Sequence, residues 1–234
     1  MIDINYFLKG FKSIKGVGSP AIALGASFVA IGALLKNLGF SIQESIFSTF
    51  LTYALPGSLV MAESMLIGAS LINIFIAVWL VNARLYPMTV ALMPLLMHEN
   101  QPRWKYYLSC HFIAVSSWLI MKDNYEEIEK ENRIDFWLGI GTATWSVAIF
   151  ATVIGFIASD FLNKDILIGL AIVNPIYFIC MMIGAMKTIQ ISVSVILGAI
   201  LGPVFYIVSP EWCILFGGFI AGTIAYLVGE KNGN

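Results

Sequence analysis

The sequence has few charged residues, and this shortage narrows what the protein can be. Only 12% of its 234 residues are charged, 59% are hydrophobic, and the mean hydropathy is +0.86. A soluble domain carries about 25% charged residues. One soluble core of this size cannot bury so much apolar sequence, and the net charge of −1 gives no basic surface for nucleic acid.

Histidine and cysteine are also scarce. The chain has two histidines and three cysteines, and each cysteine stands alone in an apolar stretch without a CxxC motif. This pattern favours free thiols over a disulfide framework or a metal site. HExxH, GxSxG, Walker and glycine-rich dinucleotide motifs are missing as well. We therefore expect no metal, no cofactor and no enzyme activity. The alternative of an intramembrane enzyme depends on Ser109 or Ser116 acting as a nucleophile beside His111.

Long uncharged runs are what the sequence contains instead. A helix needs about 20 apolar residues to cross the hydrocarbon core, because its backbone groups must bond within the segment. Seven runs fit: 17–35, 45–62, 106–121, 136–159, 166–186, 188–210 and 212–229. They predict an all-α, polytopic integral membrane protein. The first run is longer than the apolar region of a usual signal peptide, so we expect a retained helix.

An eighth crossing is expected within the stretch 64–97, whose single charge is Arg84. One straight helix of that length would extend about 51 Å, too far for a bilayer. We place a crossing at 70–96, which gives eight transmembrane helices. The alternative treats 45–64 as a re-entrant element, because Pro56 and Gly57 interrupt it, and this leaves seven.

The distribution of lysine and arginine predicts the orientation. With eight crossings and a cytoplasmic N-terminus, eight cations lie inside and four outside; the outside four are Lys36, Arg103, Lys105 and Lys164. The chain is then a single transmembrane domain, 1–234, with halves 16–121 and 136–229 joined by the polar loop 122–135. We expect a multi-pass protein of the bacterial cytoplasmic membrane.

Each predicted half contains a segment interrupted by proline, at Pro56-Gly57 in the first and at Asn174-Pro175 in the second. Paired interrupted helices in corresponding positions are typical of the central site of a secondary transporter. We therefore predict two pseudo-repeated halves with proline-broken helices. Free backbone groups beside these residues would hold the polar atoms of a substrate.

Arg84 is the residue that most suggests a function. It lies near the centre of the predicted crossing 70–96, with Asn82 two residues before it. An arginine at mid-bilayer costs at least about 2.5–3.5 kcal/mol, so it needs a partner or a wet cavity. A guanidinium can bind a carboxylate through two parallel hydrogen bonds. A structural ion pair, or an arginine that reaches the membrane surface, is the alternative.

Two further residues are candidates for moving protons. Glu63 follows Pro56-Gly57 by six residues, and His111 lies inside the run 106–121. Histidine titrates near neutral pH, so it is suited to a proton relay. The competing interpretations are a glutamate at a helix end and a neutral histidine that bonds between helices.

The chain resembles the AzlC-type family, the large subunit of two-component branched-chain amino acid exporters. The resemblance rests on GASF at 25–28, YALPGS at 53–58, FWLG at 136–139 and above all VNARLY at 81–86, and it extends over about 16–227. It implies export of valine, leucine, isoleucine or similar amino acids. It also implies a separate small membrane subunit of the AzlD type.

One position departs from the family pattern. Members of the family tend to carry acidic residues early in the fourth crossing, where this chain has Ser109-Cys110-His111. If that acid couples protons, His111 or Glu63 takes its place here, or the mechanism differs. A membrane scaffold or assembly subunit that transports nothing is the second functional hypothesis, and an intramembrane enzyme is the third.

Overall fold

The computed structural model describes residues 2–15, 20–83, 85–161, 163–186, 188–208 and 213–231. Every regular element in these ranges is a helix, as the sequence predicted. The α-helices are α1 (Ile4–Lys12), α2 (Pro20–Asn37), α3 (Ile42–Leu51), α4 (Leu55–Leu66), α5 (Leu71–Asn82), α6 (Leu85–Leu96), α7 (Arg103–Cys110), α8 (Val115–Asn124), α9 (Arg133–Ala158), α10 (Lys164–Ala185), α11 (Ile189–Val208) and α12 (Cys213–Lys231). Two short 3₁₀ helices, η1 (Tyr125–Glu127) and η2 (Lys130–Asn132), lie between α8 and α9.

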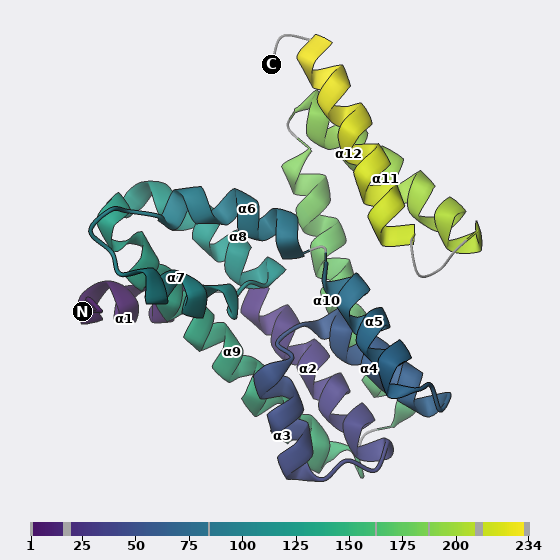
Figure 1. The fold of residues 1–234 in the computed structure, drawn as a ribbon. Coiled ribbons are helices and arrows are strands. Elements are labelled where there is room, and N and C mark those ends of the chain that lie inside the picture. The colour runs from purple at the N-terminus through teal and green to yellow at the C-terminus, as the bar shows by residue number, and fades with distance from the viewer. Residues whose placement is uncertain are drawn as a thin grey trace.

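Helix α9 is the central element, and α1, α2, α3, α7 and α8 all pack against it (Figure 1). Its 26 residues extend about 39 Å at 1.5 Å per residue, enough to cross a bilayer. Glycines permit the closest contacts: a Cβ at Gly32 would collide with the carbonyl oxygen of Thr152, and one at Gly155 with that of Val29. Helices α2 and α9 therefore pack backbone to backbone, as small residues allow in lipid.

A buried ion pair marks the N-terminal end of α9. Lys105 Nζ on α7 lies 2.6 Å from Asp135 Oδ1 on α9, and their side chains are 0% and 2% exposed. Lys105 also donates to Gln101 Oε1 at 2.8 Å, and the Asp3 N–H donates to Asp135 Oδ2 at 3.0 Å. The start of α1, the start of α7 and the loop before α7 therefore meet at this end of the bundle.

Helices α5 and α6 form a broken crossing where the sequence predicted one helix over 70–96. They are bent by 45° at the break between them. Pro87 accounts for the break, because a proline ring clashes with the carbonyl four residues earlier in a continuous helix. That carbonyl belongs to Ala83, and it accepts instead from the N–H of Tyr86 at 3.0 Å. Because the bend is only 45°, α5 and α6 run in roughly the same direction. Helix α5 therefore begins at the end of the bundle opposite to the end of α6.

Helices α3 and α4 form a hairpin that enters and leaves the bundle at one end. The chain breaks at residues 52–54, and Pro56 falls in the first turn of α4, where a proline is tolerated. Gly57 at the start of α4 packs against Asn82 at the end of α5, and a turn through Gly68 joins the other ends of the two helices. Helix α4 thus runs antiparallel to α5 and returns to the end from which α3 started. The re-entrant alternative for 45–64 fits this structure.

Helices α7 and α8 form a second hairpin, which enters from the opposite end. Gln101, just before α7, donates to the carbonyl of Glu131 at 2.8 Å, so the loops on both sides of the hairpin lie together. The chain breaks at His111–Ala114. The predicted crossing at 106–121 is therefore wrong: two helices of eight and ten residues are each too short to cross, and they return to the same side.

This hairpin changes the predicted distribution of cations. Arg103 and Lys105 lie at the same end as Lys130 and Arg133, not at the opposite end. Among the residues that the structure describes, eight cations lie at the end that holds α1: Lys9, Lys12, Lys15, Arg103, Lys105, Lys122, Lys130 and Arg133. Lys36 pairs with Asp160 at 2.7 Å at the far end, next to the start of α10.

Helix α10 packs along α2, and α11 and α12 pack on each other beyond it (Figure 1). Helix α10 continues through positions 174 and 175, so the interruption predicted at Asn174-Pro175 is not seen. Prolines are tolerated in membrane helices because neighbouring groups satisfy the freed backbone. Of the described helices, α2, α9 and α11 are each long and apolar enough to cross a membrane. The bent pair α5 and α6 makes a fourth crossing when its two helices are taken as one span.

Candidate functional site

The tips of the two hairpins meet inside the bundle. Tyr53, in the break between α3 and α4, has its ring 6.5 Å from that of His111, which follows α7 directly. Trp145 of α9 lies 6.1 Å from His111 and donates through Nε1 to the carbonyl of Phe50 at 3.3 Å. Trp145 belongs to the middle third of α9. The two breaks therefore meet at about the mid-depth of the membrane.

Six helix ends point at this region. Helices α4, α6 and α8 begin there, at Leu55, Leu85 and Val115, and α3, α5 and α7 end there, at Leu51, Asn82 and Cys110. A helix carries about half a positive charge at its N-terminus and half a negative charge at its C-terminus. Three ends of each sign therefore suit a small molecule that carries both an anionic and a cationic group.

Unpaired polar atoms gather on the same elements. Within the described part of the chain, five buried side-chain atoms have no hydrogen-bond partner: Ser27 Oγ, Tyr53 Oη, Asn82 Oδ1, His111 Nε2 and Ser116 Oγ. The hydroxyls of Ser116 and Thr144 lie near that of Tyr53, yet neither has the geometry of a hydrogen bond to it. A buried polar group without a partner costs about 1–3 kcal/mol. Such atoms mark a place that a polar ligand would satisfy.

Gly57 and Asn82, which the sequence predicted for one site, contact each other. A Cβ added at Gly57 would lie 2.5 Å from Asn82 Nδ2 and 3.0 Å from Asn82 Oδ1. Only a glycine permits this approach of the Asn82 amide to the first turn of α4. The neighbouring Pro56 is half-buried in that turn, and it has no N–H to donate.

The remaining predicted residues fall elsewhere. Glu63 is exposed in the last two turns of α4, about 9 Å along the helix from Gly57, and it is not part of the meeting of the hairpin tips. Arg84 lies outside the described residues. The side chains of Asn174 and Pro175 also lie outside what the structure describes.

Sequence reasoning missed Tyr53 and Trp145 as members of this site, and it named Ser116 beside His111 only as a possible catalytic pair. Tyr53 stands three residues before Pro56, so its place beside a helix break was available as a signal. The pair Ser116-Ser117 was a second signal. Ser117 Oγ accepts from the N–H of Ala114 at 3.1 Å and so caps the start of α8.

The walls beside the hairpin tips are apolar. Leu24, Phe28 and Ile31 of α2 form one cluster with Tyr53, and Trp145 packs against it. The described residues contain no group of three or more His, Cys, Asp or Glu side chains placed to hold a metal ion. The site therefore combines helix dipoles, hydroxyls, an amide and an imidazole with apolar walls. This combination suits a small ligand with a polar head and an aliphatic tail.

The comparison with known proteins places the chain in a family. No curated protein and no solved structure matches it. The family described as AzlC protein matches residues 20–162, from the start of α2 to just beyond α9. This region contains both hairpins and the broken crossing. Because the match includes more than half of the 234 residues, the protein belongs to the AzlC family, which is associated in general with branched-chain amino acid transport across membranes.

Proposed function

We propose that this protein is the transporting subunit of a secondary exporter for branched-chain and other hydrophobic amino acids. The observation that carries the proposal is the meeting of two hairpin tips at mid-depth, with six helix ends and unpaired polar atoms around Tyr53 and His111. Broken helices that present their ends to a midplane site are typical of secondary transporters. The family match supports amino acid transport in the same region.

The polar head of the substrate would bind at the helix ends. Its carboxylate is attracted to the N-terminal ends of α4, α6 and α8, and we propose that Arg84, which directly precedes Leu85 in the sequence, also binds it. Its ammonium group is attracted to the C-terminal ends of α3, α5 and α7, where Asn82 Oδ1 is an acceptor without a partner. Gly57 keeps Asn82 in that place.

The aliphatic tail of the substrate would lie against the apolar side chains of α2. An apolar pocket distinguishes poorly between side chains that differ by one methylene, because each is worth only about 1–3 kcal/mol. We therefore propose a range of substrates that includes valine, leucine and isoleucine. Asn174 and Pro175 of α10 remain proposed substrate contacts from the sequence alone.

His111 is the proposed proton-coupling group. It is the titratable side chain nearest to Tyr53 at the hairpin tips, and its Nε2 has no partner among the described residues. An imidazole changes charge near neutral pH. Glu63 is the alternative proton-coupling group. It is exposed near the C-terminal end of α4, so it would bind protons away from the hairpin tips, at one end of the proposed transport path.

The proposed setting is the bacterial cytoplasmic membrane, with a small membrane subunit of the AzlD type as partner. The eight cations at the α1 end support a cytoplasmic N-terminus, because cytoplasmic segments carry an excess of lysine and arginine. Both loops beside α7 and α8 would then be cytoplasmic, and the α3–α4 hairpin would enter from outside.

Leucine efflux from proteoliposomes that contain this protein and the small subunit tests the proposal. We expect efflux, and a tenfold to hundredfold lower rate for Arg84→Ala, since a charge-assisted carboxylate contact contributes about 1.5–3 kcal/mol. Lys36→Ala is a matched control, because its ion pair with Asp160 is partly exposed and contributes little. Unchanged efflux in Arg84→Ala would remove the role of Arg84.

The same experiment separates the other two hypotheses. A scaffold subunit would form the complex with its partner and show no leucine efflux at all. An intramembrane enzyme would need a nucleophile. The hydroxyl of Ser109 is engaged elsewhere, because it donates a hydrogen bond to the carbonyl of Tyr106 at 2.7 Å. We propose transport without covalent chemistry, so Ser109→Ala is expected to keep efflux within about threefold.

A further inference from the structure

A cavity of about 860 Å³ lies between the end of α6 and α7, at the end of the bundle that holds α1. Its lining runs the whole length of α7, from Arg103 to Cys110, which is about 10 Å along the helix axis. Cys110 directly precedes His111. The cavity therefore starts at the polar loops and ends beside the hairpin tips.

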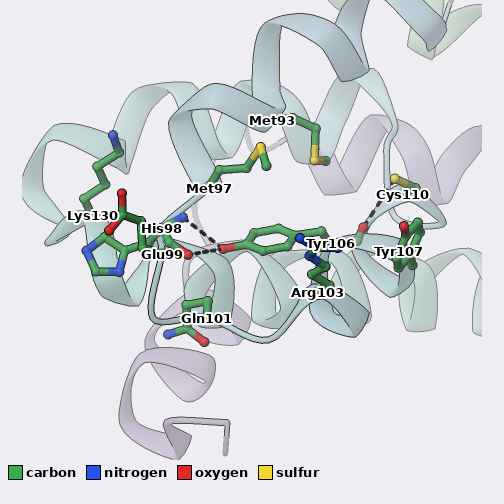
Figure 2. A pocket seen from close by; sticks show the side chains of 10 residues that line it. All are labelled: Met93, Met97, His98, Glu99, Gln101, Arg103, Tyr106, Tyr107, Cys110 and Lys130. Atoms are coloured by element: carbon green, nitrogen blue, oxygen red, sulfur yellow. Dashed lines mark hydrogen bonds between the residues drawn. The ribbon is translucent and has the colours of Figure 1, made fainter.

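The two ends of the cavity differ in chemistry (Figure 2). His98, Glu99 and Lys130 gather at one end, and Tyr107 and Cys110 lie at the other. The Tyr106 hydroxyl accepts from the His98 N–H at 2.9 Å and donates to the His98 carbonyl at 3.2 Å. This pair of bonds fixes the aromatic ring between the two ends, so the cavity has a defined shape.

The charges in this cavity are available to a ligand. Glu99, Arg103 and Lys130 take part in no ion pair within the ranges that the structure describes. Lys130 and Glu99 lie at the same end of the cavity, and a cation beside an anion suits a zwitterion, whose carboxylate binds Lys130 and whose ammonium group binds Glu99 (Figure 2). Met93 and Met97 supply flexible apolar surface on one side, which adapts to aliphatic groups of different shape.

We propose that this cavity is a second binding site, in which a zwitterionic amino acid with an aliphatic side chain is held before it reaches the hairpin tips. The inference rests on the proposed transport function and adds to it an access site with its own residues. Lys130 binds the carboxylate and Glu99 binds the ammonium group at one end of the cavity, and the methionines contact the aliphatic tail (Figure 2). The volume falls in the usual range for small-molecule sites, about 300–1,000 Å³.

Cys110 serves as a natural reporter for this site. It is exposed and lines the inner end of the cavity, whereas Cys180 and Cys213 lie on other helices and can be replaced by alanine. The experiment measures the rate at which a charged, membrane-impermeant thiol reagent modifies Cys110 in the reconstituted complex. Leucine at ten times its half-protecting concentration is expected to slow modification about tenfold, by mass action.

Three comparisons make the result specific. Aspartate and isoamylamine should protect poorly, because the first carries a charged side chain and the second lacks a carboxylate. Lys130→Gln should raise the half-protecting concentration of leucine about tenfold or more, since one charge-assisted contact is lost. Lys12→Gln removes an exposed cation of α1 outside the cavity and should leave protection unchanged.

Two outcomes would overturn the inference while the proposed function stands. The first is a complex that exports leucine although saturating leucine leaves the Cys110 rate unchanged. The second is equal protection in Lys130→Gln and in the parent protein, which would place the ligand elsewhere. A complex without leucine efflux and without protection would overturn the transport proposal as well. A Cys110 that reacts only with membrane-permeant reagents would show that the cavity faces lipid, which also contradicts the inference.

Discussion

Replacing Gly57 by alanine tests the contact between the α3–α4 hairpin and the broken crossing. The new Cβ would lie 2.5 Å from Asn82 Nδ2 and 3.1 Å from Asn82 Cγ, well inside van der Waals contact. Either the Asn82 amide rotates away or α4 shifts from α5. Overpacking of this kind costs about 1–3 kcal/mol, so we expect a lower melting temperature in detergent and about a tenfold loss of leucine efflux.

A double-mutant cycle with Asn82→Ala shows whether this contact is the cause. Removing the amide makes room for the new methyl group, so the double variant should regain the melting temperature of Asn82→Ala alone. The coupling free energy is expected at about 1–3 kcal/mol. Gly198→Ala is the matched control, because a Cβ at Gly198 meets nothing within 4 Å. Additive effects of Gly57→Ala and Asn82→Ala would refute the direct contact.

Three further perturbations follow from other contacts. Lys105→Met leaves the Asp135 carboxylate buried and unpaired, so it should cost about 3–5 kcal/mol in detergent unfolding, and the double variant with Asp135→Leu should recover most of it. Thr49→Val breaks a buried hydroxyl pair of 3.0 Å and should cost about 1–3 kcal/mol, whereas the double variant with Thr152→Val should be close to neutral. His111→Gln should flatten the pH dependence of leucine efflux between pH 5 and 8, and an unchanged profile would exclude proton coupling at His111.

The sequence predicted well those features that depend on local chemistry. An apolar composition with long uncharged runs requires a membrane and helices, and the Pro56-Gly57 pair correctly indicated a break near the start of α4. The sequence placed Asn82 and Gly57 in one substrate site, but it did not predict that the two residues contact each other. The geometry of this contact depends on α4 and α5 running antiparallel, which the turn through Gly68 determines.

Features that depend on tertiary packing were not predictable in the same way. The run 106–121 has no proline or glycine, so nothing local indicated the break at His111–Ala114. Ser117 holds that break in place by bonding the backbone of Ala114 and Phe112, and Phe112 packs over Gly141 of α9. Conversely, the proline at position 175 does not interrupt α10.

Because α7 and α8 form a re-entrant hairpin, the topology of the structure differs from the one predicted from the sequence. A run of sixteen uncharged residues is close to the length of a crossing, and it was assigned as one. The Lys105–Asp135 pair and the Gln101–Glu131 bond show that both ends of this run lie on one side. Charge counting therefore placed two cations on the wrong side, although the overall bias remained correct for the described segments.

A cross-link between the hairpin tips tests the central claim most directly. Tyr53→Cys and His111→Cys are combined in a protein whose native cysteines are replaced, and downhill leucine efflux, which needs no proton coupling, is measured before and after a short bifunctional thiol reagent. Their rings lie 6.5 Å apart, so the account predicts rapid cross-linking and loss of at least nine-tenths of the efflux, with each single variant unaffected by the reagent. Efficient cross-linking with full efflux, or no cross-linking in an active complex, would contradict a transport path between the two tips.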